Sequence, residues 1–224
     1  MLTRRHILLG AGAAALAGCN ATTTPTTPIA AIGQGVPPVP SESAFALMYG
    51  PVRNEPYAIP GVILTKVDEK YLRRIVDYPT REKPGTIIVD TNNFYLYLVL
   101  PGNRAMRYGV GLGRQGFSWQ GRATIGAKKE WPTWVPPEEM IARAPELEKY
   151  SLANGGQGPG INNPLGARAL YLFDGTRDTF YRIHGSREEW SIGHAVSSGC
   201  VRMLNQDIID LYSRAQIGAE VIVS

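Results

Sequence analysis

The sequence contains only two cysteines, Cys19 and Cys200, among its 224 residues. So few cysteines exclude a framework of disulfide bonds as the basis of the fold. The sequence also lacks an internal repeat, a stripe of basic residues typical of nucleic-acid binding, and an apolar run long enough for a clear membrane span. With 44% hydrophobic and 19% charged residues, it has the composition of one compact domain with appendages.

Residues 1–19, MLTRRHILLGAGAAALAGC, have the features of an export signal. The paired Arg4 and Arg5 resemble a twin-arginine signal, and Leu16-Ala17-Gly18-Cys19 resembles the lipobox of bacterial lipoproteins. Ordinary secretion and a chance cysteine in an Ala-rich signal are the alternatives. We expect an exported, periplasmic protein that is anchored to a membrane, the outer one favoured, by a lipid on Cys19. A lipidated Cys19 cannot form a disulfide with Cys200.

Two segments separate this signal from the main domain. Residues 20–40 are rich in Thr, Pro and Gly without a sustained period, which predicts an extended tether. Residues 41–84 contain enough apolar and aromatic side chains to pack on something, which predicts an ordered extension and not an independent domain. Within it, residues 67–80 fit either a short helix or a strand with a turn.

From residue 85 to residue 224 the pattern is that of a mainly β domain. Residues 86–113 hold β-branched and aromatic runs with turn residues at 91–93 and 101–103, typical of antiparallel strands. Further strands are predicted in 122–131, 168–173, 180–185 and 219–224. A helix limited by Pro145 is predicted after residue 136, a helix capped by Asn205 is predicted over 205–216, and 151–167 form a long Gly/Asn/Pro loop.

Cys200, in the stretch SSGCVRM, is the candidate nucleophile. The thiolate is the reactive form of a cysteine, and a nearby imidazole is the usual means of managing its proton. Outside the export signal the only histidines are His184 and His194, and both lie within the 16 residues before Cys200. We interpret His184 as the partner, because it ends an apolar run before Gly185, where a strand is expected to give way to a turn. His194 is interpreted as a surface or loop residue.

The residues around Cys200 indicate how an acyl substrate would be held. Gly199 lets the backbone approach a ligand closely, so the N–H groups from Ser198 to Cys200 can form an oxyanion hole. In an extended chain Ser198, Cys200 and Arg202 share one face. The Arg202 guanidinium can hold a carboxylate through two hydrogen bonds. Together these features predict acyl transfer through a thioester.

Other interpretations of these residues remain. Three N/S ligands can make a catalytic zinc site, and His184, His194 and Cys200 supply three, although their spacing fits no metal motif. Cys200 alone could be a buried structural thiol. Glu188 and Glu189, which lie between the two histidines, are interpreted as solvated turn residues.

The segment IHGSREEWSIGHAVSSGCVRM, residues 183–203, resembles the signature of the L,D-transpeptidase family. His184-Gly185, Ser191-Ile192-Gly193 and residues 197–202 follow the order of that signature, and the resemblance extends over about residues 85–224. It implies a mainly β fold, a sandwich or barrel with small helices and one long loop. It also implies that no metal and no cofactor is needed.

In this family a cysteine thiolate attacks the L,D peptide bond of a peptidoglycan stem peptide, releases D-alanine, and passes the acyl group to an amine of a second stem in a 3→3 cross-link. The resemblance implies that Cys200 is the nucleophile, that His184 is the general base and acid, and that the Gly185 carbonyl orients the imidazole. The backbone from Ser198 to Cys200 would hold the oxyanion, and Arg202 would organise the site or hold a carboxylate.

One position departs from the family pattern. Ser198 stands where the commonest signature has a histidine. A backbone oxyanion donor survives this change, so it bears on the acceptor or the leaving group more than on the nucleophile. Two related activities remain as alternatives, trimming of stems with water as the acceptor and attachment of proteins to the wall. A non-catalytic wall-binding lipoprotein is the alternative from another class.

Overall fold

The computed structural model describes residues 38–113, 120–197 and 199–224. The expected export signal with Cys19, most of the expected tether and Ser198 lie outside the described residues. Among the helices of the described part, none combines the length and the apolar character that a membrane crossing requires.

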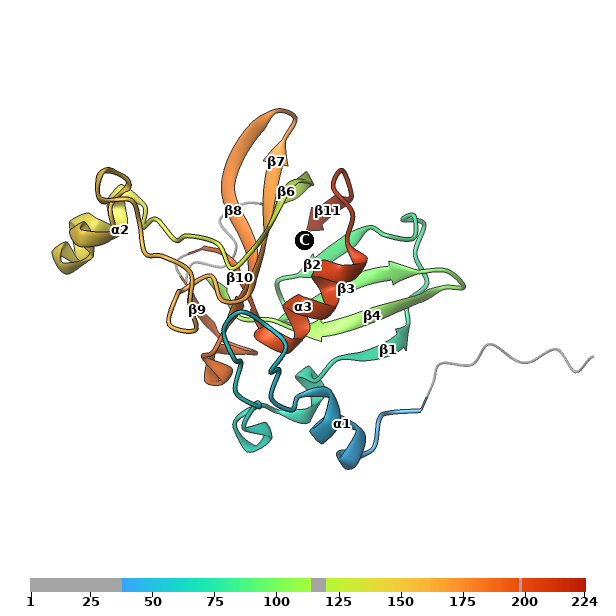
Figure 1. Ribbon diagram of the computed structural model, residues 1–224. Helices are drawn as coiled ribbons and strands as arrows, with labels where there is room; N and C mark the ends of the chain where they lie inside the picture. Colours follow the sequence, from blue (N-terminus) through green and yellow to red (C-terminus); the bar gives the residue numbers. More distant parts are fainter. Residues whose placement is uncertain (1–37, 114–119, 198) are drawn as a thin grey trace, which may run out of the picture. The chain divides into compact units, whose positions relative to one another are not determined.

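The described residues form one large mixed β-sheet and a small separate one (Figure 1). In spatial order, the nine strands of the large sheet are β1 (Arg74–Asp77), β4 (Arg104–Gly109), β3 (Tyr95–Leu100), β2 (Ile87–Asp90), β11 (Glu220–Val223), β6 (Gly121–Glu130), β7 (Arg168–Asp174), β8 (Arg177–Ser186) and β10 (Val201–Leu204). In the large sheet, as far as the structure describes it, β11 pairs with β2 and β10 with β8 in parallel, and the other neighbouring strands are antiparallel. The small sheet pairs β5 (Leu112–Gly113) with β9 (Ala195–Ser197).

Helical segments in the described chain are short. The α-helices are α1 (Glu42–Met48), α2 (Glu138–Arg143) and α3 (Asn205–Arg214), and the 3-10 turns are η1 (Leu64–Lys66), η2 (Glu69–Tyr71), η3 (Pro145–Tyr150), η4 (Leu152–Asn154) and η5 (Glu189–Ser191). The prediction of a mainly β fold with small helices is confirmed. Residues 67–80 combine both expected forms, because η2 is followed two residues later by β1.

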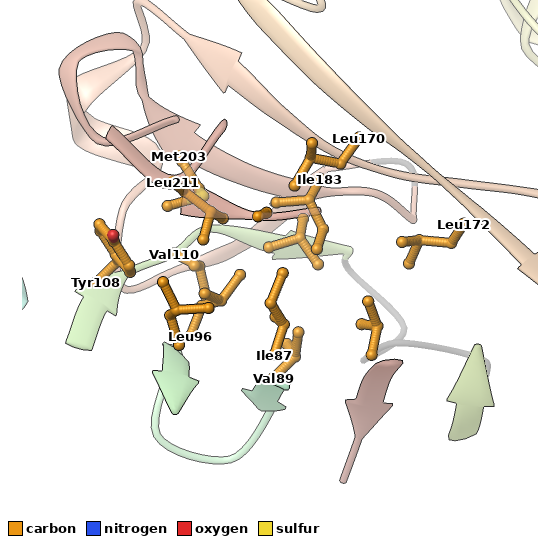
Figure 2. Packing of buried hydrophobic residues seen from close by; sticks show 14 of the residues in the cluster. Ile87, Val89, Leu96, Tyr108, Val110, Leu170, Leu172, Ile183, Met203 and Leu211 are labelled. Atoms are coloured by element: carbon orange, nitrogen blue, oxygen red, sulfur yellow. The ribbon is translucent and has the colours of Figure 1, made fainter. Parts of the chain in front are cut away.

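The core lies where alternate strand residues meet one face of α3. Strand side chains point to opposite faces in turn, so a strand contributes every second residue to the same cluster. Fully buried members include Ile87, Val89, Leu96, Tyr108, Val110, Leu170, Leu172, Ile183, Met203 and Leu211 (Figure 2). Because burying one such aliphatic side chain contributes about 1.5–3 kcal/mol, this cluster fixes β8 and β10 against α3. Those two strands carry the candidate site.

Asn205 has a different role from the expected one. It is the first residue of α3 and not its N-cap, which is Leu204, and the N-cap position makes no side-chain hydrogen bond to this helix. The side chain of Asn205 is buried, and its Oδ1 accepts the backbone N–H of Ala167 at 2.9 Å. Asparagine before a helix is a common sequence signal for a cap. Here a long-range hydrogen bond to the chain just before β7 takes that oxygen instead.

The chain before residue 84 is joined to α3 by a buried polar cluster. The Tyr49 hydroxyl donates to Oδ2 of Asp207 at 3.2 Å, and Arg73 Nη1 lies 3.4 Å from Oδ1 of the same carboxylate. Burial raises the pKa of Asp207 to about 7, with the Asp210 charge acting in the same direction and Arg73 and the Tyr49 hydrogen bond opposing it. Asp207 is completely buried, so this cluster links the extension to the domain core.

This cluster makes stability depend on pH. An aspartate in an unfolded chain titrates near about pH 4, so the folded protein holds an extra proton between about pH 4 and 7. The folded state therefore loses stability as the pH rises through this window. The Asp207→Asn variant cannot ionise at this position. We expect the difference in free energy of unfolding between Asp207→Asn and the wild type to rise in favour of the variant from about pH 4 to 7 and to stay constant above about pH 8. Urea unfolding at several pH values measures this, and a difference independent of pH would contradict it.

Candidate active site

His184 and Arg202 lie side by side on neighbouring parallel strands. In the register of β8 and β10, Arg202 pairs with His184 and Val201 pairs with Ile183. Because Ile183, Val201 and Met203 point into the core, alternation places His184 and Arg202 on the opposite face of the sheet. His184 lies inside β8, which continues to Ser186, and not at the expected change from strand to turn.

The imidazole of His184 is buried and held in one orientation. His184 is only 5% exposed, and its Nδ1 lies 2.8 Å from the backbone oxygen of Gly185. A carbonyl can only accept a hydrogen bond, so Nδ1 carries the proton in the neutral ring and Nε2 keeps a lone pair. This tautomer presents Nε2 as a base.

Burial lowers the pKa of His184 to about 4, and the charges of Arg202 and Arg182 act in the same direction. The hydrogen bond to Gly185 opposes them. Desolvation disfavours the charged form of a histidine, and two nearby guanidinium groups add to this effect. The imidazole is therefore neutral at pH 7, ready to take a proton.

Gly185 is also a point where α3 approaches the strand closely. A Cβ at this position would lie 2.3 Å from Oδ1 of Asn205 and 2.9 Å from Cγ2 of Ile208. Only glycine leaves room for this packing. We expect Gly185→Ala to lower the free energy of unfolding by about 1–3 kcal/mol or more, because it forces α3 away from β8. Chemical denaturation measures the loss, and unchanged stability would show that the contact is not tight.

Cys200 immediately precedes β10 and is half-buried. Burial raises the pKa of its thiol, while a hydrogen bond from the backbone of Arg182 and the charges of Arg182 and Arg202 lower it. The same two arginines thus act on both Cys200 and His184. Since burial favours the neutral form of each group, the resting pair is a thiol and an imidazole, and a thiolate forms only by proton transfer.

Gly199 and Cys200 are the described residues among those expected to hold an oxyanion. Gly199 has a φ of 134°, a conformation that L-residues with side chains rarely adopt. This positive φ gives a local reason for glycine next to the thiol. Ser198 lies outside the described residues, and β10 begins only at Val201. The expected extended face of Ser198, Cys200 and Arg202 therefore includes a residue outside the described chain, and of its other two members only Arg202 lies in β10.

Glu188 is solvated and lies beside a turn, as interpreted, but it also makes a specific contact. Its carboxylate forms an ion pair with the Arg202 guanidinium, Oε2 with Nη1. Glu189 also makes a specific contact, because its Oε1 accepts the backbone N–H of Ile63 at 3.2 Å. Sequence reasoning missed both contacts. The only local signal was two adjacent acidic residues shortly after His184-Gly185.

Arg182 is a second charged neighbour that the sequence analysis missed. Its guanidinium donates to both carboxylate oxygens of Asp178 at 2.7 Å and stacks on the Tyr171 ring, 4.1 Å from the centroid. These contacts fix a positive charge on the strand that carries His184. In a regular strand, residues four apart share a face but lie about 13 Å apart, so alternation does not predict this contact. The pairing of β7 with β8 is irregular between these two residues.

His194 is exposed, as expected for a surface residue. Its backbone oxygen accepts the N–H of Leu112 at 3.0 Å, which helps to place β9 beside β5. Within the described ranges, no group of three or more His, Cys, Asp or Glu side chains is arranged to hold a metal ion.

Comparison with known proteins gives these observations a family context. The chain is 31% identical over 140 residues to probable L,D-transpeptidase YbiS of Escherichia coli K12, covering 60% of this chain and 43% of that protein. It spans just under half of the length of the curated relatives it matches.

Two solved structures also resemble the chain. A Brucella melitensis protein described as a probable carnitine operon oxidoreductase is 46% identical, with 70% of this chain and 96% of that one covered and a TM-score of 0.49. An L,D-transpeptidase from Mycobacterium smegmatis is 18% identical, with 62% and 58% covered and a TM-score of 0.43. The family assignment rests on neither alignment. It rests on the model of the L,D-transpeptidase catalytic domain, which matches residues 84–223. That match covers more than half of the chain, and the chain therefore belongs to the family of L,D-transpeptidase catalytic domains.

Proposed function

We propose that this protein is a peptidoglycan L,D-transpeptidase that uses Cys200 as its nucleophile and His184 as its base. The observation that carries the proposal is the buried His184 imidazole, whose Nδ1 lies 2.8 Å from the Gly185 carbonyl oxygen. His184 lies on β8, and β8 pairs with β10, the strand that follows Cys200. A nucleophile with a base that a third group orients is the recurring arrangement of covalent catalysis. Membership of the family supplies the substrate class.

In the acylation step, Nε2 of His184 takes the proton of the Cys200 thiol as Sγ attacks the carbonyl carbon of the third stem residue. The carbon–nitrogen bond to D-alanine breaks, and the imidazolium returns the proton to the departing amine. The acyl group remains on Sγ as a thioester. Backbone N–H groups near Gly199 and Cys200 would hold the oxyanion.

In the transfer step, an amine of a second stem attacks the thioester carbonyl and loses a proton to His184. The carbon–sulfur bond breaks, and the proton passes to Sγ, so the resting thiol and imidazole are restored. Both steps need a neutral imidazole at the start. The low pKa of His184 supplies that form at neutral pH.

A purified sample incubated with a muropeptide that carries a tetrapeptide stem tests the proposal. We expect release of D-alanine and formation of cross-linked dimers. Tripeptide monomers would show that water is the acceptor, and adducts on an added protein amine would show attachment to proteins. A bound but unchanged muropeptide would favour a non-catalytic wall-binding protein and overturn the proposal.

We further propose that the protein is exported to the periplasm and anchored by a lipid on Cys19. The motif LAGC and the Thr/Pro-rich segment after it support this proposal. The intact mass of the protein purified from membranes tests it. A chain that starts at Cys19 with added acyl mass is the expected result, and an unmodified Cys19 in the mature protein would contradict it.

A further inference from the structure

The Arg202 guanidinium is held from one side by Glu188. The two side chains form an ion pair and are 23% and 45% exposed, so the pair stands at the edge of the site and not in its interior. The charge of Arg202 reaches both reacting groups, because it lowers the pKa of His184 and of Cys200. The place where Glu188 holds this charge therefore affects proton transfer between the thiol and the imidazole.

Stability does not explain the pair. Ion pairs exposed to this degree contribute little to folding, because water screens the two charges and the side chains lose conformational freedom. Such a pair can fix the position of the guanidinium, because a long arginine side chain has many conformations and a carboxylate partner selects one of them. Glu188 can fix Arg202 in this way only if its own backbone is held firmly.

The backbone of Glu188 is fixed on both sides by hydrogen bonds to serines. Its N–H donates to Oγ of Ser186 at 3.1 Å, and its carbonyl oxygen accepts the Ser191 hydroxyl at 2.6 Å. The same carbonyl accepts the N–H of Ser191 at 3.0 Å. Ser191 is completely buried, so this turn is anchored in the interior although the Glu188 carboxylate reaches outward.

The turn is also supported from the chain that precedes the family match. Glu189 accepts the N–H of Ile63, and Tyr71 fills the space next to Gly193, where a Cβ would lie 2.2 Å from its ring. Ile192 is buried in a cluster with residues of the extension, among them Phe45, Tyr49, Val67 and Leu72. Residues 45–72 thus pack against the turn that carries Glu188, although the family model begins at residue 84.

We propose that Glu188 is a positioning residue that holds the Arg202 guanidinium beside the Cys200 and His184 pair, and that the extension keeps Glu188 in place. This inference rests on the proposed function for its role in turnover. Glu188 touches no reacting atom and acts through Arg202. The chain therefore uses a segment outside the family match to complete its active site.

The test compares Glu188→Gln and Glu188→Ala with Glu189→Gln, which removes the neighbouring negative charge from the same turn but keeps an amide oxygen to accept the N–H of Ile63. The first readout is the rate of Cys200 alkylation by iodoacetamide against pH, which needs no stem peptide. In Glu188→Gln the amide oxygen still holds the guanidinium but no longer neutralises it, so the midpoint moves to lower pH by about half a unit. In Glu188→Ala the released guanidinium turns to solvent, and the midpoint lies above that of Glu188→Gln.

The second readout is kcat/KM for acylation by a tetrapeptide stem. We expect about a tenfold loss in Glu188→Ala, partial recovery in Glu188→Gln and no change in Glu189→Gln. Because Glu188 acts through Arg202, adding Glu188→Ala to an Arg202→Ala variant should produce no further loss. Additive losses, or alkylation midpoints equal to that of the wild type in both Glu188 variants, would overturn the inference. A wild type that is alkylated normally but never acylated would overturn the proposed function alone, and the midpoints would still decide the role of Glu188.

Discussion

Replacing Cys200 with alanine is expected to abolish both covalent adducts and cross-linked products. No other residue of the site can form the thioester, so only binding and oxyanion stabilisation would remain. Loss of a nucleophile from such an arrangement lowers kcat by at least about 10³-fold. Mass spectrometry after mixing with a tetrapeptide stem or with a carbapenem measures the adduct, and chromatography of muropeptides measures the product.

The fold should survive this change. Cys200 is only half-buried and is not part of the core cluster. The midpoint of thermal unfolding of Cys200→Ala should therefore lie close to that of the wild type. Dimers formed by a folded Cys200→Ala variant would contradict the proposed chemistry. A wall-binding protein without catalysis would keep its role in cells after the same substitution.

His184→Gln is expected to lower the rate of acylation by about 10²–10⁴-fold, the usual contribution of a positioned general base. Glutamine is close in size and polarity but cannot accept the proton of the thiol. In the wild type, kcat/KM should hold a plateau near neutral pH and fall on the acid side around pH 4, where the imidazole becomes protonated. His184→Gln should lose this acid limb along with the rate.

His194→Gln is the matched control, since His194 is exposed and the same change there should leave the rate and the pH profile unaltered. His184 also affects stability. Since the folded-state pKa of His184 is about 4, the unfolded chain binds its proton first as the pH falls. His184 therefore destabilises the folded state between about pH 6.5 and 4. An acid limb that persists in His184→Gln would contradict the assignment of the base.

The strands and turns of the domain were predictable because their signals are local. The hairpin between β2 and β3 turns at residues 91–93, as predicted, and Asp90 Oδ1 accepts the N–H groups of Asn92 and Asn93 at 3.2 and 3.1 Å. Such turn chemistry involves neighbours in sequence. The helix expected after residue 136 likewise ends before Pro145, because proline cannot continue an α-helix.

Contacts between distant parts of the chain were not predictable from pattern. Asn205 has the composition signal of a cap, but its oxygen binds Ala167, 38 residues away. Glu188 has the signal of a solvated turn, but a strand 14 residues later places Arg202 against it. In both cases the order of the strands in the sheet decides the partner. Neither the alternation of side chains nor the secondary-structure propensity of a segment predicts that order.

The central claim is that Cys200 becomes acylated by a stem peptide, and the intact mass of the protein tests it most directly. The protein is mixed with a tetrapeptide-stem muropeptide, quenched in acid within the first turnover, weighed and then digested to locate the modification. We predict an added mass equal to the muropeptide less D-alanine, located on Cys200 and absent from Cys200→Ala. D-alanine release with no adduct on Cys200, or an adduct on another residue, would contradict the account.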